Sequence, residues 1–473
     1  MIGVFLVLGM LAAPAPPAPA PAPAPTDFPV NTIVPRVECA DTPGQSYALY
    51  LPPGYSRGRA WPILYLFDAR SRGTLAAKLF SGPAARYKWI VASSNNTQSD
   101  GPIDPNITAF RAMWRDTHDR FSIDSNRVYA GGFSGGARVA TLMGTTAPGT
   151  VAGVIGCGAG FHTTVRRKPP FVYFGTTGYR DFNYAEMRAL GAQLEALGTP
   201  HRIEHFDGEH EWPPSEIALD AVQWMEVQAI RSSGTLGPSG ELDEILSRRR
   251  ERARALEARR PAEALSEYRS IERDFADLRD VSVTQADIVR LEHSGEVERD
   301  VAEEAKLDAQ EKRTREAFVP VWAEIRSGDA IPLQRLVQEL HIPELRERAL
   351  KGPASGDGLS AQRLLNEISA QTSYYLATGY RSEKNHAREI LCLSIAAQAR
   401  PDSPIVFYRL AEARAVAGDR EKALDDLAAA VEKGFSLPDV LEGDEDLSSV
   451  RSSPRFAALL AAVRARAQTK SES

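Results

Sequence analysis

The chain has 473 residues, of which 43% are hydrophobic and 25% charged, and its formal net charge is −6 at pH 7. This is the composition of a globular protein long enough for two or three domains, and the modest negative charge gives no electrostatic basis for binding nucleic acid. The three cysteines have no metal-ligand spacing and are too few for a disulfide framework. We expect buried free thiols at Cys39, Cys157 and Cys392, the alternative being a Cys39–Cys157 disulfide.

The N-terminal segment predicts export rather than a folded element. Residues 1–13 (MIGVFLVLGMLAA) form an apolar run that is too short to span a bilayer as a helix. The run is typical of the apolar core of a secretory signal, although the basic residues that usually precede it are missing. Residues 14–25 alternate Ala and Pro, which predicts an extended, semi-rigid spacer. We therefore expect residues 1–25 to lie outside any fold and the mature chain to have no integral membrane span, a misassigned start codon being the alternative.

Residues 26–231 alternate strand and helix patterns. Residues 62–67 (PILYLF) form the continuous apolar run expected of a buried parallel strand, and residues 33–39 and 46–51 predict a hairpin around residues 41–44. This alternation predicts an α/β domain with a mostly parallel sheet covered by helices on both faces. Further strands are predicted at 89–93, 127–133, 151–157, 171–174 and 202–206, and helices at 75–80, 108–120, from 137 onward, 184–197 and 216–230.

A helical region is predicted beyond a linker. Residues 232–240 (SSGTLGPSG) have linker composition. Residues 241–370 are highly charged, with Leu, Ala and Tyr at helical spacing, and strand signals largely vanish there. We therefore predict an all-α region that continues to residue 473.

The C-terminal residues 371–473 contain a weak internal repeat. Residues 408–434 (YRLAEARAVAGDREKALDDLAAAVEKG) predict two antiparallel helices with a turn at Gly418, and small residues such as Ala411 and Ala423 allow close approach. This unit resembles a tetratricopeptide repeat, and a less regular unit precedes it, with two extra residues around Arg381. The resemblance implies docking of a protein partner, and a plain helical hairpin is the alternative.

The central motif lies at residues 132–136 (GFSGG), between the predicted strand 127–133 and a helix that buries Val139 and Met143. In a G-x-S-x-G sequence at such a strand-to-helix turn, the serine is exposed at the carboxyl edge of the sheet. The helix that follows directs its free amide groups toward the serine. Ser134 is thus the candidate nucleophile, and an ordinary Gly/Ser turn is the alternative.

A serine nucleophile needs a base and an orienting acid on loops at the same sheet edge. His210 follows the strand that ends at residue 206 and is the candidate base. Asp181 follows the strand 171–174 and is the candidate acid, although it could instead cap the next helix. Asp207 is a rival acid but lies too near His210 in sequence to orient it easily. The sequence thus predicts a Ser134–His210–Asp181 triad.

The order Ser, Asp, His resembles the α/β-hydrolase fold over residues 32–231. In residues 47–55 (YALYLPPGY), 132–136 and 208–213 (GEHEWP) the chain is similar to bacterial esterases grouped with polyhydroxybutyrate depolymerases and feruloyl esterases. The resemblance implies the same three roles for Ser134, Asp181 and His210. It also implies ester hydrolysis through an acyl-enzyme, which requires no metal or organic cofactor.

The chain departs from this family after the first central strand, where the family carries His-Gly and this chain reads residues 67–71 (FDARS). The backbone there donates to the oxyanion, and a backbone amide needs no particular side chain. We therefore expect the oxyanion hole at Gly135 together with Ala69 or Arg70. The residues expected to line the substrate pocket are Asn95, His162 and Trp212.

The favoured function is an exported serine esterase acting on a small-molecule or polymeric ester. One alternative is an inactive hydrolase-like scaffold that works as an adaptor through its repeats. The other alternative is a serine peptidase on the same fold.

Overall fold

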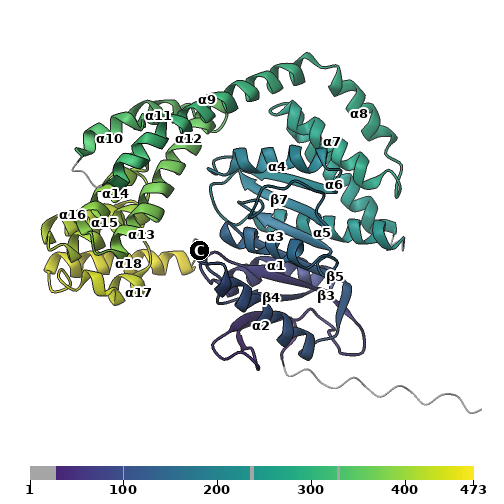
Figure 1. Ribbon diagram of the computed structural model, residues 1–473, viewed down its shortest axis with the longest axis horizontal. Coiled ribbons are helices and arrows are strands. Elements are labelled where there is room, and N and C mark those ends of the chain that lie inside the picture. The colour runs from purple at the N-terminus through teal and green to yellow at the C-terminus, as the bar shows by residue number, and fades with distance from the viewer. Residues whose placement is uncertain (1–27, 100, 235–238, 328–330, 473) are drawn as a thin grey trace, which may run out of the picture.

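The computed structural model describes residues 28–99, 101–234, 239–327 and 331–472. A sheet with its covering helices forms one part of the molecule, and a helical region wraps around it (Figure 1). The segment 1–25 predicted to be a signal and spacer lies outside the described residues. None of the helices in the described ranges has both the length and the apolar character needed to cross a membrane.

The sheet has eight strands in the order β1-β2-β4-β3-β5-β6-β7-β8. β1 pairs antiparallel with β2, and β2 pairs antiparallel with β4, whereas all other neighbours are parallel. The predicted hairpin is thus present at one edge of a mostly parallel sheet. The strands are β1 (Ile33–Glu38), β2 (Ser46–Tyr50), β3 (Trp61–Phe67), β4 (Ile90–Ser94), β5 (Ile123–Phe133), β6 (Gly153–Cys157), β7 (Val172–Gly178) and β8 (His201–Phe206).

Helices cover both faces of the sheet. Side chains of β5 alternate between the faces, with Val128 and Ala130 in one apolar core and Tyr129 and Phe133 in the other. The first core is closed by α2 (Asp104–Arg120), α3 (Gly135–Thr146) and α4 (Tyr184–Ala196), and the second by α1 (Gly73–Tyr87) and α5 (Ser215–Ser233). The predicted α/β-hydrolase fold class is confirmed, together with an all-helical region after it.

Several elements are longer than the sequence pattern predicts, among them β7 and α1. β7 continues through residues 175–178, where the Gly-Thr sequence suggests a loop, because these residues pair in parallel with β8. α1 continues through Pro83 to Tyr87. A proline usually ends a helical pattern, so the sequence does not indicate the second half of this helix. The three cysteines are buried and free, which agrees with the expected thiols. Burial raises the pKa of all three thiols, those of Cys39, Cys157 and Cys392, to about 12.

The helical region begins on the far side of the sheet and returns to its carboxyl edge. The 33-residue α9 (Gly295–Ser327) arches between the two places (Figure 1). The elements before it are α6 (Ser239–Glu257), α7 (Pro261–Phe275) and α8 (Ser282–Glu292). Those after it are α10 (Leu333–Glu339), α11 (Ile342–Ala349), α12 (Gly356–Ser369), the π-helical η1 (Ala370–Leu376), α13 (Ala377–Ser382), α14 (His386–Ala399), α15 (Pro404–Val416), α16 (Arg420–Glu432), α17 (Pro438–Gly443), the 3₁₀ turn η2 (Glu445–Leu447) and α18 (Pro454–Glu472).

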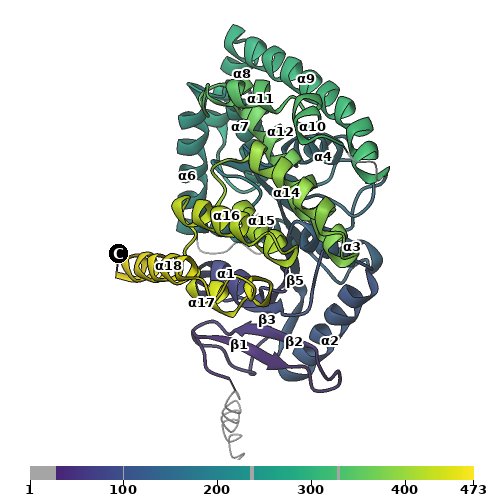
Figure 2. The same ribbon diagram turned by 90° about the vertical axis from the view of Figure 1, so that its left-hand side faces the viewer.

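The C-terminal helices lie in front of the sheet domain in the view of Figure 2 and to one side of it in Figure 1. α15 and α16 join through Gly418, whose φ of 87° favours glycine, and Asp419 caps α16. The relation of these helices to tetratricopeptide repeats stays a prediction.

A buried ionic network fastens α6 and α7 to the sheet domain. Arg249 of α6 contacts Asp274 at 2.6 Å and Glu267 at 2.9 Å, both on α7. Asp274 in turn accepts hydrogen bonds from Trp224 and Gln228 of α5, each at 2.9 Å. Because two carboxylates converge on one guanidinium away from water, losing the guanidinium would leave uncompensated buried charge.

We predict that Arg249→Met lowers the free energy of unfolding by about 3–5 kcal/mol, because Asp274 then loses its buried counter-ion and Glu267 keeps only Arg202. Urea unfolding measures the loss. The matched control is Arg290→Met. Arg290 also has two carboxylate partners, but its side chain is 50% exposed. The control is expected to cost about 1 kcal/mol or less. Equal losses in the two variants would contradict the prediction.

Candidate active site

Ser134 occupies a strained turn between β5 and α3. β5 ends one residue before it and α3 begins one residue after it, and its backbone has φ 55° and ψ −122°. The turn tolerates no neighbouring side chains, because a Cβ on Gly132 would lie 2.3 Å from the carbonyl carbon of Gly136, and a Cβ on Gly136 would lie 1.9 Å from the carbonyl oxygen of Phe67. A non-glycine residue held in this conformation stores strain of the kind that clusters at functional sites.

The structure brings Ser134, His210 and Asp181 together. The Nε2 atom of His210 lies 2.9 Å from the Oγ of Ser134. Its Nδ1 lies 2.9 and 3.0 Å from the two carboxylate oxygens of Asp181. With the ring proton on Nδ1, the imidazole donates to Asp181 and its Nε2 accepts from the Ser134 hydroxyl. This is the arrangement in which a histidine can take the proton of a serine that attacks a carbonyl.

Asp181 combines two functions that the sequence presented as alternatives. Its side chain is fully buried, and one carboxylate oxygen also accepts the amide of Asn183 at 2.8 Å, immediately before α4. The same carboxylate therefore both organises the start of a helix and holds His210. The rival Asp207 lies on the His210 loop, is largely exposed and pairs with Arg180.

Two phenyl rings hold the imidazole of His210. The ring centroid of Phe133 lies 4.7 Å from that of His210, and the ring centroid of Phe182 lies 4.3 Å from it. Phe133 is the variable residue of the G-x-S-x-G motif, and Phe182 follows Asp181 in sequence. These contacts limit the orientations that the imidazole can adopt, and only 18% of its side chain is exposed.

Two backbone amides remain as candidate donors of the oxyanion hole. The Arg70 amide donates to the carboxylate of Asp68 at 2.8 Å, so it is engaged elsewhere. Ala69 is then the remaining amide of the two expected on this loop. The second expected amide belongs to Gly135, the first residue of α3, where amides lack partners within the helix. A Cβ on Gly135 would lie 2.1 Å from the Cβ of Ser99, so the loop that carries Ser99 packs tightly against the start of α3.

Asp68 links the loop after β3 to the loop after β8. We call residues 68–72 the oxyanion loop and residues 207–214, which carry His210, the base loop. Asp68 is fully buried, accepts the indole Nε1 of Trp212 at 2.8 Å, and pairs with the guanidinium of Arg72 at 2.9 Å. Burial alone would raise its pKa, but the hydrogen bonds from Arg72, Trp212 and the Arg70 amide hold that pKa below its usual range. A single carboxylate thus fixes both loops that flank the Ser134 hydroxyl, a part of the site that the sequence analysis missed.

Two cavities meet at Ser134. The base-side cavity of about 490 Å³ contains Ala69, His210 and Trp212, and the helix-side cavity of about 550 Å³ contains Gly135 and His162. Residues shared by both cavities are Ser99, Ser134, Phe182 and Tyr375.

The helical region forms part of the walls of both cavities. The π-helical η1 contributes Tyr374 and Tyr375 to the base-side cavity, and the guanidinium of Arg70 lies 5.4 Å from the ring centroid of Tyr374. π-helical turns often occur at functional sites. The residues from the helical region are Asn366, Ser369, Ala370, Ser373, Tyr374, Tyr375, Arg400, Ser403, Ile405 and Val406 in the base-side cavity, and Arg315, Glu367, Gln371 and Tyr375 in the helix-side cavity.

The structure places two of the three predicted pocket residues in these cavities. His162 lines the helix-side cavity and Trp212 the base-side cavity, whereas Asn95 lines neither. The side-chain amide of Asn95 donates to the Pro35 carbonyl at 3.1 Å, and its backbone amide donates to the Ser46 carbonyl at 3.0 Å. Its position after β4 suggested the pocket, but the side chain turns toward the β1–β2 hairpin.

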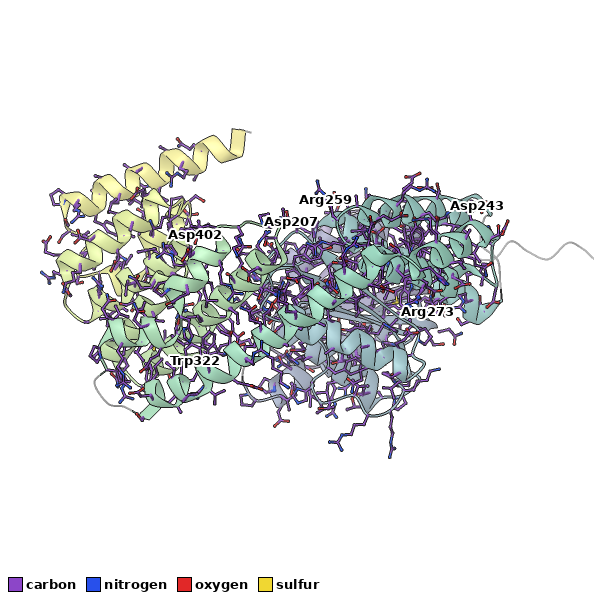
Figure 3. The ribbon with its side chains drawn as sticks, turned by 90° about the horizontal axis from the view of Figure 1, so that it is seen from above. Asp207, Asp243, Arg259, Arg273, Trp322 and Asp402 are labelled. Atoms are coloured by element: carbon purple, nitrogen blue, oxygen red, sulfur yellow. The ribbon has the colours of Figure 1, made fainter. Side chains whose placement is uncertain are left out.

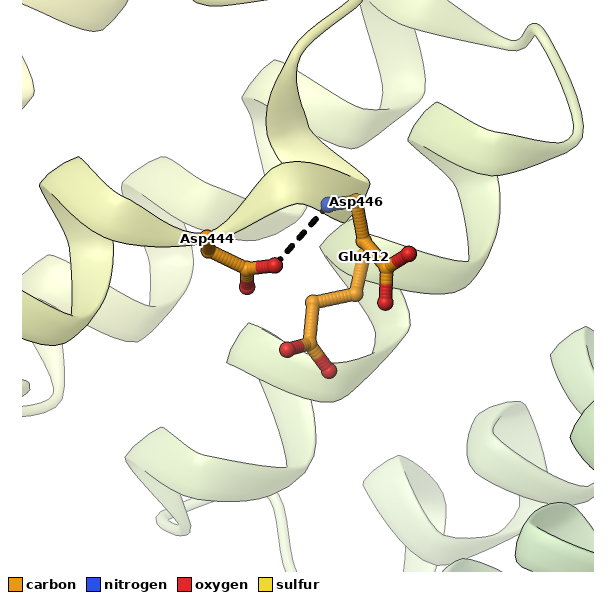
Figure 4. Close-up of side chains that lie close together, drawn as sticks. All are labelled: Glu412, Asp444 and Asp446. Atoms are coloured by element: carbon orange, nitrogen blue, oxygen red, sulfur yellow. Dashed lines mark hydrogen bonds between the residues drawn. The ribbon is translucent and has the colours of Figure 1, made fainter.

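A group of carboxylates in the C-terminal helices lies apart from the triad (Figure 4). Glu412, Asp444 and Asp446 are the acidic side chains among the described residues whose oxygens lie within cation-binding distance of one another. Protein groups already contact them, since Arg381 pairs with Glu412 at 3.5 Å and with Asp446 at 3.1 Å, and the Tyr408 hydroxyl donates to Asp444. Burial, reinforced by Asp444, raises the pKa of Glu412 to about 8.

Comparison with known proteins gives structural likeness alone. No protein-family model matches the chain, and no curated protein matches its sequence. The apoenzyme of S-formylglutathione hydrolase FrmB from Staphylococcus aureus is similar at 14% identity over 42% of this chain and 98% of that chain, with a TM-score of 0.34. The Pyrobaculum calidifontis esterase is 10% identical over 43% of this chain and 87% of that one, with a TM-score of 0.36. A ferulic acid esterase is 14% identical over 41% of this chain and 97% of that one, with a TM-score of 0.33.

We predict that Asp68→Asn lowers kcat/KM for an ester substrate about 10- to 100-fold, because the two loops beside Ser134 lose their common partner. The free energy of unfolding should fall by about 2–3 kcal/mol. The matched control is Asp116→Asn, another buried carboxylate that pairs with an arginine four residues later but lies on α2. The control should lose similar stability and keep kcat/KM, and an equal loss of activity in both variants would refute the role given to Asp68.

The raised pKa of Glu412 predicts a pH-dependent stability. Between its ordinary pKa of 4.5 and its folded-state pKa of about 8, the folded protein binds a proton that the unfolded chain releases. The free energy of unfolding therefore falls as the pH rises through this window. We expect Glu412→Gln to remove this part of the pH dependence in urea unfolding between pH 5 and 9, whereas Glu421→Gln at an exposed position of α16 should not. Parallel stability curves for wild type and Glu412→Gln would contradict the prediction.

Proposed function

We propose that the protein is a serine hydrolase that cleaves carboxylic esters. The observation that carries this proposal is the 2.9 Å contact between His210 Nε2 and the Ser134 Oγ, made by a serine in a strained strand-to-helix turn while Asp181 holds the other ring nitrogen. Strain, base and acid occur together at the edge of the sheet where α/β enzymes place their reactive groups.

The reaction follows from these positions. The Ser134 oxygen attacks the ester carbonyl while His210 takes its proton, and Asp181 stabilises the imidazolium that forms. The amides of Gly135 and Ala69 donate to the oxygen that becomes negative. His210 then protonates the departing alcohol, and a water molecule repeats the sequence on the acyl-enzyme.

We infer a small-molecule ester as the substrate. The two cavities that meet at Ser134, of about 490 and 550 Å³, have the size of ordinary small-ligand sites. Their arrangement on either side of the serine provides separate spaces for the acyl and alcohol groups. Because η1 and α12 form part of the walls of both cavities, a substrate of limited length fits this site better than a long polymer.

We expect a fluorophosphonate probe to label the wild-type protein and to leave Ser134→Ala unlabelled, since the probe requires an activated serine. Hydrolysis of a short-chain ester should fall at least ~10⁴-fold in Ser134→Ala, by comparison with other serine triads. Ser81→Ala is the matched control and should behave as wild type, because Ser81 is a half-buried serine on α1 whose hydroxyl donates to the Lys78 carbonyl. Labelling that persists in Ser134→Ala would contradict the assignment.

Activity and labelling measurements on the wild-type protein also distinguish the alternative functions. A panel of esters and of amides with the same acyl groups distinguishes an esterase from a peptidase. A wild-type protein that is neither labelled nor active on any member of the panel would favour the scaffold hypothesis.

A further inference from the structure

We propose that the helical region is part of the catalytic apparatus, because it holds the loop that carries Asp181. The proposal rests on the proposed triad. The acid loop is defined as residues 179–182, between β7 and α4. The clamp is defined as Arg315 of α9 with Arg363 and Asn366 of α12. These three side chains are positioning residues that act on His210 through the loop.

Each clamp residue donates to a different backbone carbonyl of the acid loop. Arg363 Nη1 donates to the Tyr179 carbonyl at 3.0 Å, and Asn366 Nδ2 donates to the Arg180 carbonyl at 2.8 Å. Arg315 Nη2 donates to the Phe182 carbonyl at 3.3 Å. The remaining carbonyl of the loop, that of Asp181, accepts the Tyr184 amide at 3.0 Å. All four carbonyls around the candidate acid are therefore engaged, three of them by the helical region.

The other side of the acid loop is tied to the loop that carries His210. The Tyr179 amide donates to the Phe206 carbonyl at 2.9 Å, and the Arg180 amide donates to the Gly208 carbonyl at 3.0 Å. The acid loop thus lies between the base loop and α12. A displacement of α12 would move the carbonyls of the acid loop relative to the base that Asp181 has to meet.

A second contact extends the same network to the base loop. Arg400, at the end of α14, contacts Glu209 at 3.0 Å and also donates to the Oδ1 of Asn366. Glu209 immediately precedes His210 in sequence. One buried amide side chain, Asn366, therefore connects the acid loop on one side and, through Arg400, the base loop on the other.

The clamp is built from side chains that are costly to bury. Arg363 is 5% exposed and Asn366 is 8% exposed. The charge of Arg363 is balanced by Glu311 of α9, which is 1% exposed and contacts its Nε at 2.9 Å. A buried ion pair adds little net stability, but it fixes the orientation of the guanidinium that reaches the loop. Charge-assisted donors from arginine are also stronger than neutral ones.

The first test variant is Asn366→Asp. It is nearly isosteric and retains an acceptor for Arg400, but it replaces the donor facing the Arg180 carbonyl with a carboxylate oxygen. The second is the double variant Glu311→Gln/Arg363→Gln, which removes the donor to Tyr179 without leaving a buried charge. Because the two variants perturb folding differently, failure of one to fold leaves the other informative.

The control is Arg273→Gln in α7. Arg273 also belongs to the helical region and donates to a carbonyl of the sheet domain, that of His201, at 3.3 Å. His201 lies at the start of β8, away from the carboxyl edge of the sheet. Figure 3 shows Arg273 on the side of the molecule opposite the C-terminal helices, where Asp402 marks the region near Arg400.

We expect kcat for a short-chain ester to fall about 10- to 100-fold in both test variants of the full-length chain, with KM changed less than about 3-fold. In the double variant, which keeps the net charge of the chain, the acid limb of the pH profile of kcat/KM should move to lower pH, because the imidazolium loses part of its carboxylate partner. Arg273→Gln should retain the wild-type kcat. Test variants that match Arg273→Gln in kcat, or a double variant that loses kcat with an unmoved acid limb, would overturn the proposal.

A proton NMR measurement tests the clamp independently of turnover. The Nδ1 proton of His210, shared with Asp181, should give a far-downfield resonance in the wild type and in Arg273→Gln, and that resonance should shift or disappear in Asn366→Asp. Its absence from the wild type, or its persistence unchanged in Asn366→Asp, would overturn the clamp. A wild type that shows the resonance but neither cleaves esters nor reacts with fluorophosphonate would instead reject the proposed function.

Discussion

The geometry of the site depends on how closely backbone atoms approach at the turn around Ser134. The Gly132 and Gly136 positions face main-chain atoms at distances that no Cβ can occupy, and one of those atoms is the carbonyl oxygen at the end of β3. This packing holds Ser134 at φ 55° and sets its side chain beside the imidazole. Since β3 also leads into the loop that carries Ala69, the same contact limits the distance between Ser134 and the proposed oxyanion donors.

Around this turn the polar side chains form two layers. Asp68 joins the oxyanion loop to the base loop from within the sheet domain, and Asn366 joins the acid loop to the base loop from the helical region. Both are buried, and both connect segments that are distant in sequence. The candidate active site thus contacts the sheet domain through Asp68 and α12 through Asn366, and the rings of Phe133 and Phe182 lie against the imidazole of His210.

Local signals in the sequence were sufficient for much of this arrangement. The glycines around Ser134 reflect contacts within one turn, and Asp181 and His210 follow strands whose carboxyl ends share an edge. The position of Asn95 after β4 was misleading, because strand position fixes a residue at the edge but not the direction of its side chain. Likewise, the residues around Arg70 in the sequence do not indicate that the backbone amide of Arg70 donates to the carboxylate of Asp68.

The contributions of the helical region could not be predicted. Helical spacing identifies the apolar face of α12, but not that Arg363 and Asn366 on the same helix meet the acid loop. The partners lie too far apart in the chain for any pattern to pair them. The same holds for Tyr375, which reaches both cavities from a π-helical segment whose sequence looks like an ordinary helix.

The separation along the chain has a consequence for biosynthesis. Asn366 and the Arg180 carbonyl that it contacts are 186 residues apart. At a translation rate of about 5–20 residues per second, Asn366 is added roughly 10–40 s after Arg180. A nascent chain therefore has its sheet domain before it has the helices that hold the acid loop, and the finished arrangement around Asp181 forms only late in synthesis.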